Sequence, residues 1–478
     1  MMDVKKIIPT LLYMALKNKY LRKSLLKKVE NMIYKERVLN SNTTLPKVIE
    51  MERFYILRAM LYSAFRAIEK GYFSPKVASR IAKNLVEGAL LKSEKEKMEK
   101  YEEKYGEYPP AFITLSPTKV CNLRCKGCYA ASEATSKDTL PYNLVEKILD
   151  DIRENWGVHF TVISGGEPFM YRSEGKTLLD IFDKYRDIFF LVYTNGTLID
   201  RAIAKLLAEF GNVTPAISVE GFEKETDERR GKGVFKKILR AFDYLKEEGV
   251  PLGVSLTATR ENAHLFMDDE LYDYYFEEIG VTHMWIFQYM PIGRGYNPDL
   301  MVTPEQRVKM LKQWRKCMVE KKYFVADFWN SGVVASGCIA YGRDGGYLYI
   351  DWNGKIMPCV FVPFYVDTVY DIYSKGKTLT DAIQRPFFKR GREWQRKYGY
   401  CRYHKVKINN WFMPCSIRDH YENFVKNIHK GEAKPEDENA AQFIKDDEYF
   451  GKMVKYDDEL EKLTDPLWEK FLKEGKLD

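Results

Sequence analysis

Short runs of β-branched and aromatic residues alternate with amphipathic helical stretches between residues 111 and 300. The runs are AFITLSPT (111–118), FTVISGGEP (160–168), FFLVYTNGT (189–197), TPAISVEG (214–221), LGVSLTAT (252–259) and HMWIFQYMPIG (283–293). Helical stretches follow the runs near 142–155, 176–186, 198–209, 234–248 and 268–279. Six such alternations predict an α/β fold with a parallel sheet and crossover helices. The loops after the strands then form the active face.

The segment before this core, residues 1–110, has a helical pattern throughout. Apolar positions there recur at spacings of three and four and so share one helix face, with lysines among them: Leu21, Leu25, Val29, Met32 and Ile33. The pattern predicts an N-terminal helical extension that caps the next domain. A basic amphipathic helix on a membrane surface is a second interpretation, and the two do not exclude each other.

After the core, residues 301–334 are predicted to form a linking helix. From about 335 the periodicity breaks into glycines, aromatics and short strands, with a DWNG hairpin turn at 351–354. This pattern predicts a small auxiliary domain over 335–425, held by metal rather than by a large core. Residues 426–478 are charged and predicted to be a helical tail.

Length and composition narrow the class of protein. A chain of 478 residues is too long for one ordinary core, so several domains are expected. Eight cysteines are too few for a disulfide scaffold, and with neither a secretory signal nor a run of 18 apolar residues we expect a cytoplasmic protein. The net charge of +8 comes without a recognition motif, so no nucleic-acid partner is predicted.

The segment CNLRCKGC places three cysteines, Cys121, Cys125 and Cys128, on the loop after the first predicted strand. Three thiolates on one short loop can hold three corners of an iron–sulfur cubane, and soft thiolate sulfur also suits zinc. A zinc site would want a fourth nearby Cys or His, and this loop contains none. A zinc knuckle or incidental buried thiols remain the alternatives.

With SGGEP (164–168) one β/α unit further on, the sequence resembles the radical SAM superfamily over 111–300. The resemblance implies a partial (β/α)6 TIM-like barrel in which a 4Fe–4S cluster leaves one iron open for S-adenosylmethionine. It also implies a set of cofactor-binding positions at the strand ends: Tyr129, Gly165, Gly166, Glu167, Asn195, Ser218, Arg230 and Met290. Gly165 and Gly166 would let the backbone approach a ligand closely, and Glu167 would support the loop.

Arg230, in ERRGKG (228–233), is predicted to pair with the cofactor carboxylate, because a guanidinium fork suits that group. Its alternative is an ordinary solvated charge. The sequence departs from the family at two places. Gly127 stands where an aromatic residue often precedes the third cysteine, and Glu220 stands where many relatives have Asp. These departures affect the expected adenine-side contacts and remove no cluster ligand.

The implied chemistry belongs to the cofactors. One electron, from a donor such as ferredoxin or flavodoxin, cleaves the sulfonium of S-adenosylmethionine, and the resulting 5′-deoxyadenosyl radical removes a hydrogen atom from the substrate. By this resemblance, the missing fourth ligand of the cluster is the cofactor itself. The enzyme would be an oxidoreductase or would form carbon–carbon bonds.

Four more cysteines lie in the predicted auxiliary domain: Cys338, Cys359, Cys401 and Cys415. The spacing around DWNG resembles the SPASM and twitch domains, which implies an auxiliary 4Fe–4S cluster on these four residues. A zinc ribbon is the alternative, since tetrathiolate sites also hold zinc. Cys317 lies in a helical stretch and is predicted to be a core thiol, and His420 is predicted to be structural.

The substrate is the open part of the interpretation. A lipid hydrocarbon chain, with carbon–carbon bonding between isoprenoid tails, is our first hypothesis, based on the basic amphipathic N-terminus and on lipid-linking enzymes suspected within a similar group. Peptide maturation is the second, and it predicts a winged-helix module with a hairpin before residue 111. A non-catalytic iron–sulfur protein is the third, and it would need neither SGGEP nor an open iron.

Overall fold

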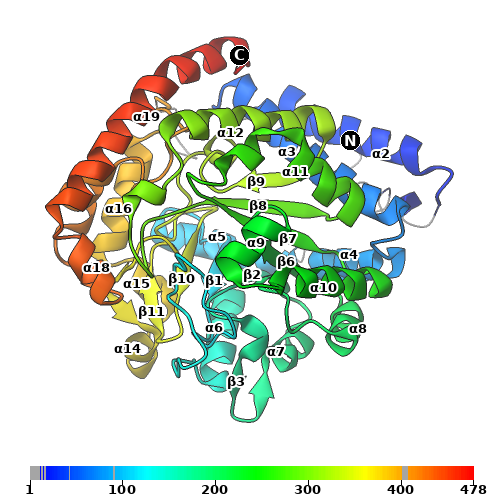
Figure 1. Cartoon of the computed structure of the whole chain (residues 1–478), viewed down its shortest axis with the longest axis horizontal. Coiled ribbons are helices and arrows are strands. Elements are labelled where there is room, and N and C mark those ends of the chain that lie inside the picture. The colour runs from blue at the N-terminus through cyan, green and yellow to red at the C-terminus, as the bar shows by residue number, and fades with distance from the viewer. Residues whose placement is uncertain are drawn as a thin grey trace.

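The computed structural model describes residues 18–41, 43–89, 92–400 and 407–477, together with Leu11, Met14 and Ala15. Its centre is a sheet of ten strands in the order β13-β11-β10-β1-β2-β5-β6-β7-β8-β9. Helices surround this sheet (Figure 1). The described strands form an open row, so the predicted α/β partial barrel is confirmed.

Six parallel strands form the middle of the sheet, and each lies within one of the six predicted runs except β6, which begins one residue earlier. They are β1 (Phe112–Leu115), β2 (Phe160–Ile163), β5 (Phe189–Thr194), β6 (Val213–Val219), β7 (Gly253–Ala258) and β8 (His283–Gln288). Most of their residues are buried, as expected for parallel strands covered on the outside by helices. The covering helices are α6 (Tyr142–Trp156), α7 (Leu178–Lys184), α8 (Arg201–Phe210), α10 (Val234–Glu248), and α11 (Asp269–Asp273) continued by η4 (Tyr274–Ile279).

The sheet continues beyond these six strands on both sides. β9 (Val325–Asp327) adds to β8, and β10 (Tyr347–Ile350) lies parallel to β1. The segment predicted as a linking helix contains β9 after α12 (Pro304–Lys316) and η6 (Cys317–Lys321). A strand of three residues is too short to show a periodic pattern, so the sequence did not reveal it.

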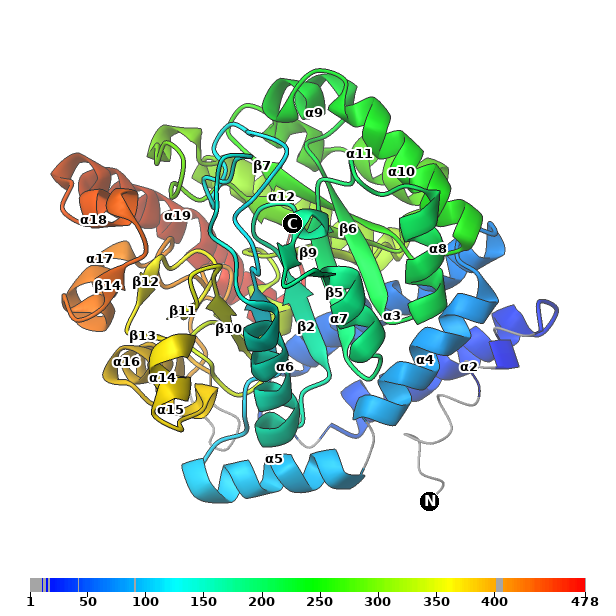
Figure 2. The same ribbon diagram turned by 90° about the horizontal axis from the view of Figure 1, so that it is seen from below.

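The auxiliary region is joined to the sheet through β10, which pairs with β1 on one side and with β11 on the other. The DWNG turn joins β10 to β11 (Lys355–Met357) as predicted, and β11 pairs with β13 (Asp367–Thr368). Its other elements are α13 (Gly332–Ala335), β12 (Phe364–Tyr365), α14 (Val369–Ser374), α15 (Leu379–Ile383), α16 (Pro386–Lys397), α17 (Tyr421–Asn423), η7 (Phe424–His429), β14 (Lys434–Pro435) and α18 (Glu438–Phe443). Figure 2 shows this region, in yellow and orange, at one end of the sheet. α19 (Asp447–Glu474) then runs along the outside and contacts α12.

Short elements complete the core: η2 (Pro168–Met170), β3 (Arg172–Ser173), β4 (Lys176–Thr177), α9 (Glu223–Arg230), η3 (Ala263–Met267) and η5 (Pro298–Leu300). The N-terminal helices are α2 (Arg22–Tyr34), continued by η1 (Lys35–Leu39), α3 (Lys47–Glu69), α4 (Pro75–Ala89) and α5 (Lys92–Tyr105). Among the described residues, no helix combines the length and the apolar character needed to cross a bilayer.

The apolar face of α2 packs mainly against the protein. Leu26 and Val29 are buried, and the Tyr62 hydroxyl of α3 donates a hydrogen bond of 2.8 Å to the Glu30 carboxylate. Leu21, at the start of the stripe, is exposed. This packing is that of the helical cap, and it gives no support to a membrane-facing helix.

Deleting residues 1–34 should therefore destabilise the protein. Each Leu or Val side chain that leaves a buried site costs about 1.5–3 kcal/mol, and the deletion also exposes the facing surface of α3. We expect a lower melting temperature, and we expect neither the intact nor the truncated chain to sediment with anionic vesicles. Loss of vesicle binding without a change in melting would instead favour the membrane-surface helix.

Candidate functional site

Cys121, Cys125 and Cys128 lie on the loop that follows β1 and line one cavity of about 370 Å³. The loop is braced from the segment after β8. The Arg294 guanidinium donates to the carbonyl of Cys125 at 2.9 Å and to that of Ser132 at 2.8 Å. The sequence did not point to Arg294, because its partners lie more than 160 positions earlier in the chain.

The chemistry of these thiols fits a cluster ligand set. Burial raises the pKa of Cys121 to about 12, and burial also raises the pKa of Cys125 against the opposing charge of Arg230. Both are therefore neutral thiols until a metal supplies positive charge. The three thiols line the same cavity, and thiolate sulfur is the ligand that holds iron–sulfur clusters.

The two glycines of SGGEP pack against the cysteine loop itself. A Cβ on Gly166 would lie 2.2 Å from the carbonyl oxygen of Val120, and one on Gly165, whose φ is +109°, would lie 2.7 Å from that of Thr118. Both glycines also line the cavity. The sequence predicted that the backbone of the two glycines would approach a ligand closely. In the structure their backbone instead lies against the loop that carries the cysteines.

Glu167 lies behind the cavity and joins this loop to the end of β5. Its buried carboxylate accepts hydrogen bonds from the Thr194 hydroxyl at 2.7 Å and from the Asn195 backbone N–H at 2.8 Å. The Asn195 side chain in turn donates to Asn122 Oδ1, at 2.8 Å, within the cysteine loop. Glu167 thus supports the cysteine loop from behind, and the geometry does not place it on the cavity wall, although it was predicted as a cofactor-binding position.

The other predicted cofactor positions line the cavity together: Tyr129, Gly165, Gly166, Asn195, Ser218, Arg230 and Met290. They come from the ends of β1, β2, β5, β6 and β8 and from α9, so the parallel sheet assembles them at one edge. The Tyr129 hydroxyl accepts from the Gly165 N–H at 3.2 Å, and the hydroxyls of Ser218 and Ser255 lie 3.1 Å apart.

Two arginines, and not one, point toward the cysteines. The guanidinium groups of Arg229 and Arg230 both pair with Glu220, which is 1% exposed. Burial opposes the charge of Arg230, but the Glu220 carboxylate and the nearby cysteines raise its pKa. Arg229 also donates to the Lys126 carbonyl at 3.0 Å. The family departure at Glu220 thus supplies one carboxylate to both cations.

Replacing Arg230 with alanine should weaken S-adenosylmethionine binding while both clusters remain. Loss of a charge-assisted hydrogen bond costs about 1.5–3 kcal/mol, which is roughly 10- to 150-fold in the dissociation constant. Equilibrium dialysis of the reconstituted protein measures this change. The neighbouring Lys232→Ala, on an exposed side chain, is the control and should leave binding unchanged. Equal affinity of Arg230→Ala and the unmodified chain would identify Arg230 as a purely structural partner of Glu220.

Gly127 has an aromatic neighbour from elsewhere in the chain. A Cβ on Gly127 would lie 3.0 Å from the Tyr289 ring, and φ of Gly127 is +61°. Tyr289, just after β8, thus places its ring beside the third cysteine, where the family often uses the preceding residue. The Tyr289 hydroxyl donates to the Gly295 carbonyl at 2.9 Å, which fixes the ring. Sequence reasoning missed Tyr289 because the contact joins two distant segments.

Away from the cysteines, the cavity becomes aromatic. Its walls there include Phe112, Phe160, Leu191, Tyr193, Trp285, Phe287, Phe328, Tyr347 and Phe361. The Tyr193 ring meets that of Phe287 edge-on, with 5.4 Å between centroids, and Phe361 lies 5.4 Å from Phe328. Arg229 and Arg230, both at the cysteine end, are the charged side chains among the residues that line it.

A second cavity of about 250 Å³ brings together Cys338, Cys359 and Cys415. Cys401, the fourth predicted ligand, lies outside the described residues. Burial raises the pKa of Cys359 to about 12, and burial also raises the pKa of Cys338 against hydrogen bonds from Ala340 and Gln395 and the charge of the buried Arg343. Three convergent thiols with a buried cation beside them fit an anionic thiolate cluster.

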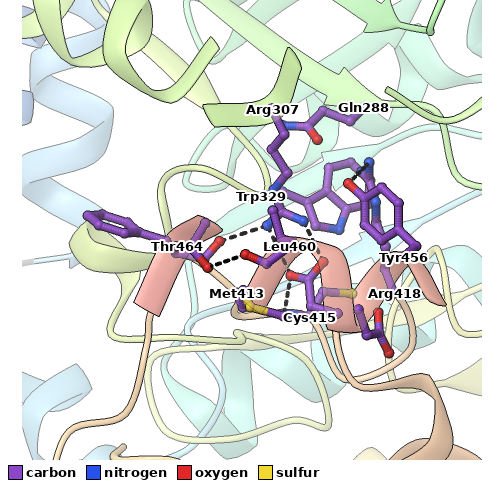
Figure 3. A network of polar contacts seen from close by, with 12 residues as sticks. Gln288, Arg307, Trp329, Met413, Cys415, Arg418, Tyr456, Leu460 and Thr464 are labelled. Carbon is purple, nitrogen blue, oxygen red and sulfur yellow. Dashed lines mark hydrogen bonds and ion pairs between the residues drawn. The ribbon is translucent and has the colours of Figure 1, made fainter. Parts of the chain in front are cut away.

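The third of these cysteines is held by a buried ion pair (Figure 3). The Asp419 carboxylate accepts from the Cys415 N–H at 3.0 Å and pairs with Arg307 through both oxygens. Arg307 also donates to the Phe412 carbonyl at 2.9 Å. Cys317, in contrast, is a fully buried thiol outside both cavities, and His420 contacts the Met413 carbonyl at 2.9 Å. Both occupy the structural positions that the sequence predicted.

Comparison with known proteins agrees with this geometry. Residues 115–266, which run from β1 through η3, match the radical SAM superfamily. These residues form a radical SAM domain. Members of this superfamily are enzymes that use a 4Fe–4S cluster and S-adenosylmethionine, with an external electron donor. The cysteine loop of the first cavity, Cys121 to Cys128, lies within this domain, and the cysteines of the second cavity lie outside the matched residues.

Three relatives show the range of the radical SAM proteins that this chain resembles. Fe-coproporphyrin III synthase of Methanosarcina barkeri is 29% identical over 50% of this chain and 57% of its own length. AdoMet-dependent heme synthase of Oleidesulfovibrio alaskensis is 24% identical over 62% of this chain and 80% of its own. The subtilosin biosynthesis protein AlbA of Bacillus subtilis is 25% identical over 54% and 56%. The chain thus spans little more than half the length of the first and third.

Proposed function

We propose that this protein removes a hydrogen atom from an unactivated carbon of an uncharged, largely apolar substrate group, with a lipid hydrocarbon chain as the first candidate. A 4Fe–4S cluster with S-adenosylmethionine, held by Cys121, Cys125 and Cys128, would supply the 5′-deoxyadenosyl radical. The observation that carries the proposal is the aromatic cavity that starts at these cysteines; among the described residues that line it, the cations lie at the cysteine end.

The cavity has a charged part beside the cysteines and an aromatic part further in, and this division indicates where the cofactor and the substrate would bind. Arg229 and Arg230, paired with Glu220, offer charge-assisted contacts to a carboxylate beside the cysteines. The aromatic walls further in offer apolar area and exclude water from a reactive centre. A charged substrate group there would be transferred out of water without gaining a partner of opposite charge, and this transfer costs free energy.

A tetrapyrrole is the second candidate, supported by the names of two relatives and by flat aromatic walls. Its carboxylates would need cations that the described lining offers only at the cysteine end. Peptide maturation has the support of the AlbA name, but the described residues before 111 form helices, without the hairpin that this hypothesis predicts. A non-catalytic role leaves the cavity and the paired arginines unexplained.

Deuterium transfer tests the proposal. The reconstituted protein is incubated anaerobically with a reductant, S-adenosylmethionine and one perdeuterated substrate at a time. The three substrates are an isoprenoid lipid, coproporphyrin III and a peptide, and 5′-deoxyadenosine is examined for deuterium by mass spectrometry. We expect deuterium only with the lipid. Product formation from coproporphyrin or peptide, with none from lipid, would contradict the lipid assignment. The chain lacking Cys121, Cys125 and Cys128 is the control. Lipid extracts from a host with and without the gene would then identify the product.

A further inference from the structure

We infer that Tyr347 is a positioning residue that couples the auxiliary cluster site to the substrate cavity by a hydrogen bond to Cys359. This inference rests on the auxiliary 4Fe–4S cluster that the sequence predicts for Cys338, Cys359, Cys401 and Cys415 and does not depend on the proposed substrate. Tyr347 opens β10, the strand that joins the auxiliary region to β1. Its hydroxyl oxygen lies 2.9 Å from Cys359 Sγ.

The ring of Tyr347 forms part of a wall that the two cavities share. Four side chains line both cavities: Trp285, Phe328, Ile339 and Tyr347. Of these, Tyr347 is the one whose polar atom contacts a cysteine sulfur in the described structure. The ring of Tyr347 therefore lines the aromatic end of the substrate cavity, and its hydroxyl contacts Cys359, a predicted cluster ligand.

The position of Tyr347 is set by the sheet. Phe112 of β1 and Tyr347 of β10 are paired in register, and their rings stack with 5.0 Å between centroids and 3° between planes. Tyr347 is 2% exposed. Because stacking, strand pairing and burial all restrict the ring, its hydroxyl has one direction available, toward Cys359.

The consequence is electrostatic. When Cys359 is a thiolate, Tyr347 donates its hydroxyl proton to the sulfur, which also receives the Phe361 N–H at 3.4 Å. Hydrogen bonds to cluster sulfurs favour the more negative, reduced state and so raise the reduction potential. Tyr347 should therefore set the potential of the auxiliary cluster without affecting the cluster on Cys121, Cys125 and Cys128.

The test is a redox titration of the full reconstituted chain followed by EPR. Tyr347→Phe keeps the stacked ring and removes the hydroxyl. We expect the reduction equilibrium of the auxiliary cluster to become about tenfold less favourable, a shift of 59 mV to more negative potential for one electron. Iron content and the potential of the other cluster should stay unchanged. Site-specific 3,5-difluorotyrosine at 347, a stronger donor in its protonated form at pH below its own pKa, should shift the potential the opposite way.

Tyr349→Phe is the matched control. Tyr349 lies two residues further on β10, on the same face, and is 1% exposed, but its hydroxyl makes no hydrogen bond to a cysteine sulfur among the described residues. Two results would overturn the role of Tyr347 while leaving the auxiliary cluster in place. One is an equal shift of the reduction potential in Tyr349→Phe, and the other is an unchanged potential in Tyr347→Phe with eight irons bound. About four irons in the unmodified chain would overturn the auxiliary cluster and this inference together.

Discussion

Alanine at Cys121, Cys125 and Cys128 together is expected to abolish cleavage of S-adenosylmethionine and to lower bound iron from about eight to about four per chain. The three thiols line the cavity at the carboxyl ends of the parallel strands. Their loss therefore removes every predicted side-chain ligand of the cluster that binds S-adenosylmethionine. The second set lies in a separate cavity and should keep its iron. Iron assay and 5′-deoxyadenosine formation after anaerobic reconstitution measure both effects.

Cys317→Ala is the matched control for this experiment. Cys317 is a fully buried cysteine that lines neither cavity, so the variant should bind as much iron as the unmodified chain and cleave the cofactor at the same rate. Two results would contradict our interpretation. Iron near four in the unmodified chain, with stoichiometric zinc, would replace the auxiliary cluster by a zinc ribbon. Residual cofactor cleavage in the triple variant would place the radical chemistry elsewhere.

Leucine at Arg307 is expected to lower the free energy of unfolding by about 3–5 kcal/mol, because breaking a buried ion pair leaves one charge without compensation. The Arg307 and Asp419 side chains are 1% and 0% exposed. Burial works against the charge of Arg307, but the Asp419 carboxylate raises its pKa. Without Arg307, Asp419 remains buried next to Cys415 with one hydrogen-bond donor, the Cys415 N–H, among those described.

Urea unfolding of the metal-free chain, followed by tryptophan fluorescence, measures this loss. The control is Arg201→Ala, whose partner Glu247 is also exposed, and whose effect should stay below about 1 kcal/mol. Because Asp419 orients the Cys415 backbone, Arg307→Leu should also reduce iron at the auxiliary site. Equal stabilities of Arg307→Leu and Arg201→Ala would show that the chain relaxes to solvate Asp419.

The sequence by itself determined the repeating part of the fold. Each of the six β-rich runs contains a strand, because a buried parallel strand needs a continuous apolar run and the helix that follows needs an apolar stripe. It also determined the chemistry of the first site, since Cys121, Cys125 and Cys128 share one short loop and SGGEP follows one β/α unit later. Local spacing carries such information because the residues concerned lie close together in the chain.

Only the tertiary structure decided the contacts between distant segments. It brought Cys338, Cys359 and Cys415 to one cavity and placed Tyr289 beside Gly127. It buried Leu26 and Val29 of α2 and joined Glu30 of this helix to Tyr62 of α3, where the sequence allowed a membrane surface as well. An amphipathic pattern states that one face is buried but not what covers it, and a lone side chain carries no signal of a partner a hundred residues away. Packing of the whole chain settles both.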